Sequence, residues 1–126
     1  MNLNSALLAA AGGALGSAAR YFVGAIAFRL FGPEFPWGTL AVNVIGCLLM
    51  GILAGFVILR DAVAADLRIF LMTGVLGGFT TFSAFALDSY FLYERTPAAA
   101  GIYIAASVVL SLAALLAGLF AVRLLP

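Results

Sequence analysis

The sequence has no histidine and no lysine, and its single cysteine, Cys47, lies inside an apolar run. A His or Cys metal site, a disulfide within the chain and Ser-His catalysis therefore lack their parts. Charge is scarce too, because 9% of the residues are charged, against roughly 25% in an average soluble domain. The net charge of +1 offers no basic patch to a nucleic acid. We expect neither an enzyme nor a nucleic-acid-binding protein.

Hydrophobic residues, by contrast, make up 66% of the 126 residues. One membrane crossing takes about 20 apolar residues, so the chain has room for four helices and short loops. The apolar runs predict spans at residues 3–30, 38–59, 69–93 and 98–122 in one transmembrane domain, residues 1–126. No basic residue precedes the first run and no convincing cleavage site follows it. We interpret it as a retained span rather than a signal peptide.

The third span does not have the pattern of a plain hydrophobic helix. Gly77 and Gly78 free the backbone to unwind, and Thr80, Thr81 and Ser83 are residue types that cap a restarting helix. A broken membrane helix exposes carbonyls that suit a cation and amide hydrogens that suit an anion. We predict a break near the middle of this helix. The alternative is a glycine kink sealed by neighbouring hydroxyl groups.

The arginines are divided almost evenly between the two sides of a four-span chain. One side holds Arg60, Arg68 and Arg123, and the other holds Arg29 and Arg95, plus Arg20 if its side chain snorkels. So small a bias favours insertion in both orientations, which permits an antiparallel two-fold dimer. Charge alone leaves a single orientation equally open.

Glycines recur four residues apart in three of the spans. Such spacing lets helix backbones approach closely in lipid. The pairs are Gly12 and Gly16, Gly51 and Gly55, and Gly74 and Gly78.

Several uncharged polar side chains lie within the spans. Asn43 places an amide in an apolar helix, where the simplest role is a contact between helices worth about 0.6 to 2 kcal/mol. Tyr103, Ser107 and Ser111 recur every four residues and so stack hydroxyls along one face of the fourth span. Each serine alone can bond to its own helix, but three hydroxyls in a row indicate a polar track.

Two aromatic and two charged residues complete the candidate groups. Phe82 and Phe85 share one face of the resumed helix, as core residues or as rings whose positive edges solvate a small anion. Arg20 and Asp88 are the charges inside span-like segments, and such charges are functional candidates by default. Arg20 can reach a vestibule and attract anions there. Asp88 can cap, pair with an arginine or line an entrance.

Three sequence blocks, in order, resemble the bacterial fluoride channels called Fluc or CrcB. They are GALGSAARY at residues 13–21, WGTLAVNVIG at 37–46 and GVLGGFTTFSAF at 74–85. The resemblance covers nearly the whole chain. It implies an all-α membrane protein of four transmembrane helices, the third broken, in an antiparallel dual-topology homodimer. It also implies two fluoride pathways and a structural sodium ion between the subunits.

The resemblance assigns expected roles to individual residues. Asn43, Phe82, Phe85 and Ser83 belong to the fluoride pathway, together with the polar track of Tyr103, Ser107 and Ser111. Gly77 and Thr80 match the positions whose backbone carbonyls hold sodium, and Arg20 matches the family's first-helix arginine in a vestibule. Two positions depart from the pattern: the family commonly has Thr where this chain has Ala84, and often Glu where it has Asp88.

The function implied is a passive fluoride-selective channel in the bacterial inner membrane, which lets fluoride leave the cytoplasm and so lowers its toxicity. Fluoride, a second copy of the chain and the lipid bilayer are the expected partners. Two other classes of protein fit the residues less well. A proton-coupled small multidrug transporter needs a carboxylate in its first span, where this chain has only Arg20. A non-transporting scaffold would be indifferent to changes at Asn43 and Phe85, apart from stability.

Overall fold

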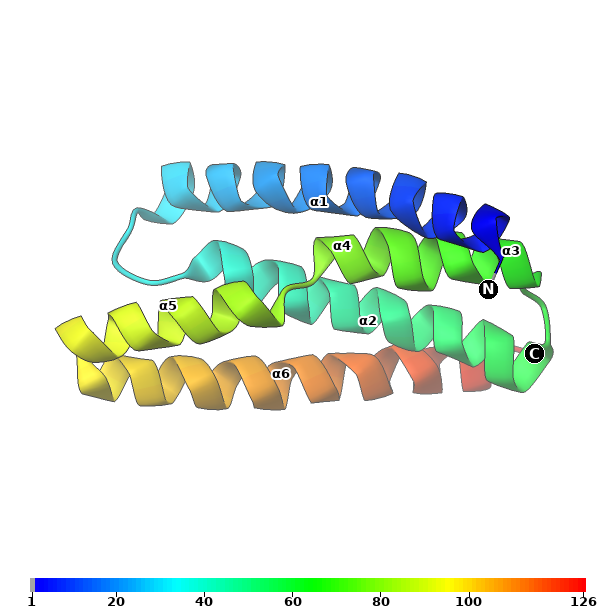
Figure 1. Ribbon diagram of the computed structural model, residues 1–126. Coiled ribbons are helices and arrows are strands. Elements are labelled where there is room, and N and C mark those ends of the chain that lie inside the picture. The colour runs from blue at the N-terminus through cyan, green and yellow to red at the C-terminus, as the bar shows by residue number, and fades with distance from the viewer. Residues whose placement is uncertain (1) are drawn as a thin grey trace.

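The computed structural model describes residues 2–126 and is helical along almost all of them. Figure 1 shows long helices running side by side, with the connection from α1 to α2 and the turn from α5 to α6 at one end of the bundle. Both termini lie near the other end. The elements are α1 (Leu3–Phe31), α2 (Trp37–Arg60), α3 (Ala65–Arg68), η1 (Ile69–Leu76), α4 (Gly77–Phe79), α5 (Phe82–Arg95) and α6 (Pro97–Arg123).

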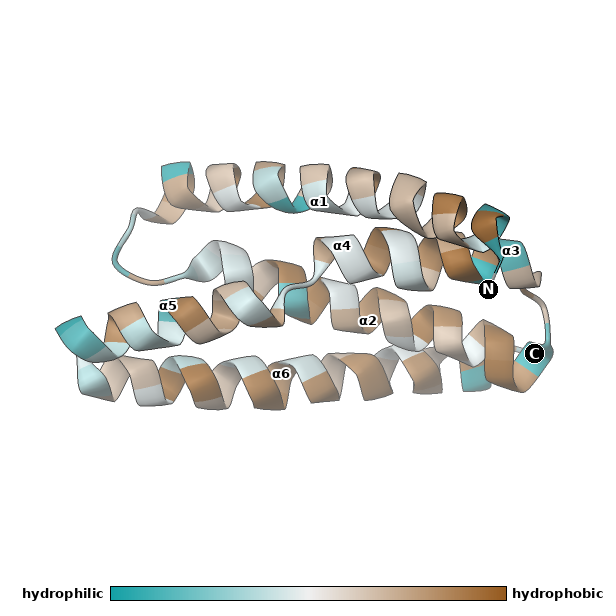
Figure 2. Cartoon of the chain, in the orientation of Figure 1, coloured by the Kyte–Doolittle hydropathy of each residue, from teal (hydrophilic) through white to brown (hydrophobic). Residues whose placement is uncertain are grey.

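Four of these units are long and apolar enough to cross a membrane: α1, α2, the stretch Ala65–Arg95 and α6. The prediction of four spans with an interrupted third one is thereby confirmed, although the third begins at Ala65 rather than at residue 69. Figure 2 shows that hydrophilic residues gather mainly at the two ends of the bundle. Large exposed hydrophobic side chains, such as Leu15, Phe22 and Val109, cover the sides, as a lipid environment requires.

Glycine allows the helices to pack with their backbones in contact. A Cβ at Gly51 of α2 would overlap the Leu115 carbonyl of α6, and one at Gly118 of α6 would overlap the Leu48 carbonyl of α2. In the other pair of helices, a Cβ at Gly12 of α1 would lie 2.9 Å from the Gly74 Cα of η1. The four-residue spacing in the sequence therefore predicted real points of close approach.

A glycine at such a contact should resist even the smallest substitution. A Cβ at Gly16 would overlap the Val75 carbonyl and lie 2.8 Å from the Phe79 nitrogen, so we expect Gly16→Ala to destabilise the fold by about 1–3 kcal/mol. Gly24 lies on the same helix, where an added Cβ would meet nothing within 4 Å, and Gly24→Ala should be neutral or slightly stabilising because alanine favours helix. Unfolding of both variants in detergent measures the difference. Equal stabilities would contradict this role of Gly16.

The third span is interrupted at Thr80 and Thr81, which have extended backbones with ψ of 158° and 115°. The expectation that Gly77 and Gly78 unwind is wrong, because both belong to α4. Gly78 instead packs against α1, where an added Cβ would lie 3.0 Å from the Gly13 Cα. The absence of a side chain at Gly78 allows the two helices to pack closely, and the helix unwinds two residues later, at Thr80. The preceding segment η1 is π-helical, a rare form that is frequent at functional sites.

Candidate ion pathway at the helix break

The side chain of Asn43 on α2 hydrogen-bonds to the unwound backbone at the break in the third span. Its Nδ2 donates to the Thr81 carbonyl at 3.0 Å, and its Oδ1 accepts from the Thr81 N–H at 2.7 Å. Both main-chain polar groups of one unwound residue are thus satisfied by a single amide. This pairing explains how extended backbone persists within an apolar bundle, where unpaired groups cost several kcal/mol each.

The two threonines at the break have different tasks. Thr81 starts α5 as its N-cap, because its hydroxyl accepts from the Ala84 N–H at 3.2 Å. Thr80 finishes α4, since its hydroxyl and its N–H both donate to the Leu76 carbonyl, at 2.9 Å and 3.0 Å. The predicted capping of the restarting helix is therefore found at Thr81, whereas Thr80 bonds backwards.

A cavity of about 320 Å³, which we call the break cavity, lies beside this junction. Predicted pathway residues from three helices meet in it: Asn43 from α2, Phe82 and Phe85 from α5, and Ser107 and Ser111 from α6. Its other lining residues are Cys47, Thr80, Thr81, Val108 and Leu112. The walls combine amide and hydroxyl groups with aromatic rings and carry no charged side chain.

Two hydroxyl groups of the polar track are buried without a hydrogen-bond partner in the chain: Tyr103 Oη and Ser107 Oγ. Tyr103 is 0% exposed and Ser107 is 5% exposed. A buried hydroxyl without a partner costs about 1–3 kcal/mol, so these two groups are the natural donors for a water molecule or an ion. Ser111 is half-buried one turn further along α6.

Aromatic rings connect the break to the end of the bundle. Phe82 and Phe85 have ring centroids 5.4 Å apart, and Phe85 lies 5.5 Å from Tyr103. Tyr103 in turn meets Phe35 edge-to-face at 5.4 Å, and Phe35 lies 4.6 Å from Trp37. One of these contacts is edge-to-face and the others are tilted, and aromatic contacts of this kind are favourable. They hold Tyr103 between the break cavity and the α1–α2 loop.

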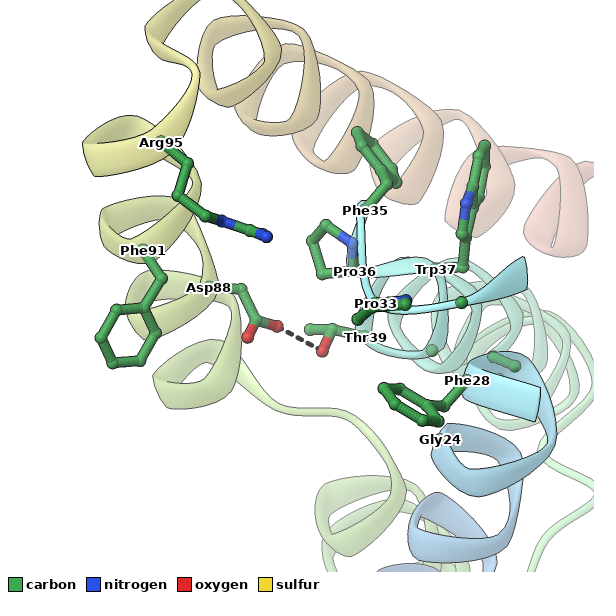
Figure 3. Close-up of a pocket in the computed structure, with 13 residues that line it drawn as sticks. Gly24, Phe28, Pro33, Phe35, Pro36, Trp37, Thr39, Asp88, Phe91 and Arg95 are labelled. Atoms are coloured by element: carbon green, nitrogen blue, oxygen red, sulfur yellow. Dashed lines mark hydrogen bonds between the residues drawn. The ribbon is translucent and has the colours of Figure 1, made fainter. Parts of the chain in front are cut away.

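A second cavity, which we call the loop cavity, has a volume of about 310 Å³ and lies between the end of α1, the α1–α2 loop, α2 and α5. Figure 3 shows Arg95 and Asp88 of α5 facing it from one side and Thr39 of α2 from the other. The Thr39 hydroxyl donates to Asp88 Oδ2 at 2.6 Å, a short charge-assisted contact. Asp88 therefore lines this cavity and bonds to Thr39, whereas its expected place at an entrance stays a prediction.

The remaining predicted residues lie outside both cavities. Arg20 is half-buried on α1 and lines neither of them. Ser83 is exposed on α5, with its Oγ 3.4 Å from the Thr81 hydroxyl. Gly77 is exposed on the face of α4, and an added Cβ there would meet only the Met72 carbonyl oxygen, at 3.6 Å.

Sequence reasoning missed Thr39, Phe35 and Arg95 at the loop cavity. A signal for Thr39 was present, because it precedes Asn43 by four residues and so shares its helix face. The approach of Phe35 to Tyr103 had no such signal, since the two are joined only through the fold. Over residues 2–126, no group of three or more His, Cys, Asp or Glu side chains is arranged to hold a metal.

The chain is similar to one family of known proteins along nearly its whole length. The model of the family described as CrcB-like protein, Camphor Resistance (CrcB), matches residues 7–119. The chain is 60% identical over 121 residues to a fluoride-specific ion channel FluC of Rhizobium etli, which covers 95% of this chain and 97% of that protein. Two proteins with the same name are similar too. The one from Agrobacterium fabrum is 54% identical and covers 89% of this chain and 90% of that protein. The one from Rhizobium meliloti is 52% identical and covers 96% of this chain and 98% of that protein.

Proposed function

Because this chain belongs to the CrcB family, whose similar members are fluoride-specific channels rather than enzymes, we propose that it is a passive fluoride-selective channel exporting fluoride from the cytoplasm. The observation that carries the proposal is the break cavity. There an amide, two threonines and the buried unpartnered hydroxyl of Ser107 meet a pair of phenylalanine rings. No other ion needs to move in exchange.

The chemistry of the break cavity supports selectivity for a small anion. Fluoride holds its water tightly, so a pathway must replace that water with close hydrogen-bond donors, and the Ser107, Ser111 and Tyr103 hydroxyls are such donors. The edges of Phe82 and Phe85 add partial positive charge without a fixed cation that would trap the ion. A larger halide would have to press against the same rings.

We infer that the pathway continues from the break cavity past Tyr103 to the loop cavity. The Tyr103 hydroxyl lies near Ser107, Thr39 and Asp88, although none of them is its hydrogen-bond partner. Ser107 lines the break cavity, whereas Thr39 and Asp88 line the loop cavity. An ion handed from Ser107 to Tyr103 would therefore come out beside Thr39 in the loop cavity, where the Arg95 guanidinium offsets the negative charge of Asp88.

A passive mechanism suits export of this ion. In an acidic environment fluoride enters cells as neutral HF and dissociates inside, so the anion accumulates and tends to leave down its electrochemical gradient. A bacterium made sensitive to fluoride should, when it carries this chain in its inner membrane, grow at fluoride concentrations that stop the strain without it. Equal sensitivity of the two strains, with the protein present in the membrane, would argue against export.

An antiparallel dimer would complete the site. Phe82, which lines the break cavity, is 80% exposed in the single chain, so lipid would otherwise face a polar junction. Lipid-exposed irregular backbone does not occur within the hydrocarbon region. A second copy in the opposite orientation, which the even division of arginines permits, would cover this face twice by symmetry.

The backbone carbonyl groups at the end of α4 are ligands of the chemical type that sodium prefers. A helix end leaves its last carbonyls without helical partners, and Gly77 and Thr80 belong to this end, with no side chain at Gly77 to obstruct an approaching ligand. Backbone carbonyls at a broken helix suit Na⁺. We propose that these carbonyls hold the ion where two subunits meet, and that it fastens the subunits together.

Removal of sodium should therefore weaken the dimer. Replacing it by a bulky organic cation such as N-methylglucamine should increase the monomer fraction on size-exclusion chromatography and lower fluoride flux. Gly77→Ala should also weaken the dimer, because the added methyl group would stand where the ion and the second subunit approach. The isolated chain itself has room for this methyl group. Gly24→Ala should leave association unchanged. A dimer indifferent to both treatments would contradict the assignment of Gly77.

A further inference from the structure

The single cysteine of the chain shares the break cavity with the proposed fluoride donors. Cys47 is a free thiol of intermediate exposure on α2 and lines the cavity together with Asn43 and Ser107. It follows Asn43 by four residues, so it stands one turn along the same helix face. The sulfur is thus beside the proposed ion route rather than in a closed helix contact.

A second feature indicates that this cavity holds a polar occupant. The Ser107 hydroxyl is buried, lines the cavity and has no partner in the protein. Such a group is normally satisfied by water or by a ligand. A small solute that enters this cavity would meet the Cys47 side chain, and the thiolate is the nucleophilic form of a cysteine.

We propose that Cys47 is a modification site within the pathway, where a small disulfide-forming electrophile attaches and obstructs fluoride. With methyl methanethiosulfonate the thiolate attacks the sulfenyl sulfur. A new S–S bond forms, the S–SO2 bond breaks, methanesulfinate leaves with the electron pair and the thiol proton passes to the buffer. The product carries a methylthio group one helical turn from Asn43. The inference rests on the proposed function, since obstruction presupposes a fluoride flux.

The expected result is a coupled change in mass and flux. Wild-type protein in liposomes treated with methyl methanethiosulfonate should gain one methylthio group by intact mass spectrometry, necessarily at Cys47. Fluoride efflux should fall at least tenfold relative to the same protein untreated, and dithiothreitol should restore it. Cys47→Ser should show neither the mass gain nor the loss of flux relative to its own untreated value.

Two further variants test whether the loss of flux depends on where the modified cysteine lies. A cysteine in place of Val108, which lines the same cavity from α6, should make the Cys47→Ser protein sensitive again. A cysteine in place of Leu124, which is exposed at the end of α6 and lines neither cavity, should be modified in the Cys47→Ser protein without loss of flux. Cys47→Ala provides a second background without a thiol if serine at position 47 folds poorly.

The failures of the two proposals can be told apart. Folded wild-type protein that conducts fluoride but resists the reagent, or that is modified without losing flux, would overturn the inference alone. Equal inhibition of the Cys47→Ser variant would do the same. Wild-type protein that conducts no fluoride before treatment would instead overturn the proposed function, and this inference with it.

Discussion

Asn43→Asp should reduce fluoride flux at least a hundredfold while the protein stays folded. The new carboxylate can still accept the Thr81 N–H but can no longer donate to the Thr81 carbonyl, a loss of about 1–3 kcal/mol. A negative charge would also stand in the path of an anion. At 4 Å and an effective dielectric constant near 20, this repulsion is about 4 kcal/mol, which corresponds to roughly a thousandfold in an equilibrium constant.

The matched control is Asn4→Asp, the same chemical change on the exposed first turn of α1, which should leave flux unchanged. A fluoride electrode reports efflux from liposomes, and size-exclusion chromatography reports folding and association. If Asn43→Asp conducted like the wild type, Asn43 would only join helices and would have no place in the pathway.

Phe85→Ile should produce the second large loss of flux, of at least tenfold. Phe85 lines the break cavity and contacts both Phe82 and Tyr103 through its ring. Isoleucine keeps an apolar side chain there but has no positive ring edge, and it leaves Tyr103 without its neighbour on the cavity side. Because the ring is only half-buried, we expect a stability loss of about 1–2 kcal/mol.

Phe22→Ile provides the comparison, because Phe22 is 63% exposed on α1 and lines neither cavity. That variant should conduct like the wild type. The scaffold hypothesis makes the opposite prediction for Phe85, namely a change in stability with no specific loss of transport. A loss of flux at Phe85→Ile that its loss of stability fully explains would contradict a specific role of the Phe85 ring in transport.

The helices and the polar face of α6 could be predicted from sequence because each depends on local pattern. Apolar length specifies the four spans, and a four-residue period places Tyr103, Ser107 and Ser111 on one face. The glycine spacing likewise anticipated close helix contacts. These features require no knowledge of which helix lies beside which.

The details of the site could not be predicted in this way, because they depend on contacts between distant segments. Asn43 and Thr81 are 38 residues apart, and nothing in either segment indicates that the amide would pair with that one residue. Gly78 is helical and packs against Gly13 of α1, a neighbour that the fold supplies. The bond from Thr39 to Asp88 likewise spans two helices.

The central claim is that the purified chain passes fluoride and excludes chloride. Wild-type protein in liposomes loaded with both anions tests it most directly. A cation ionophore lets the counter-cation leave together with the anion, and ion-selective electrodes follow fluoride and chloride outside the liposomes. We predict that fluoride leaves down its gradient while chloride stays inside. Well-folded protein that releases no fluoride, or that releases chloride equally fast, would contradict the account.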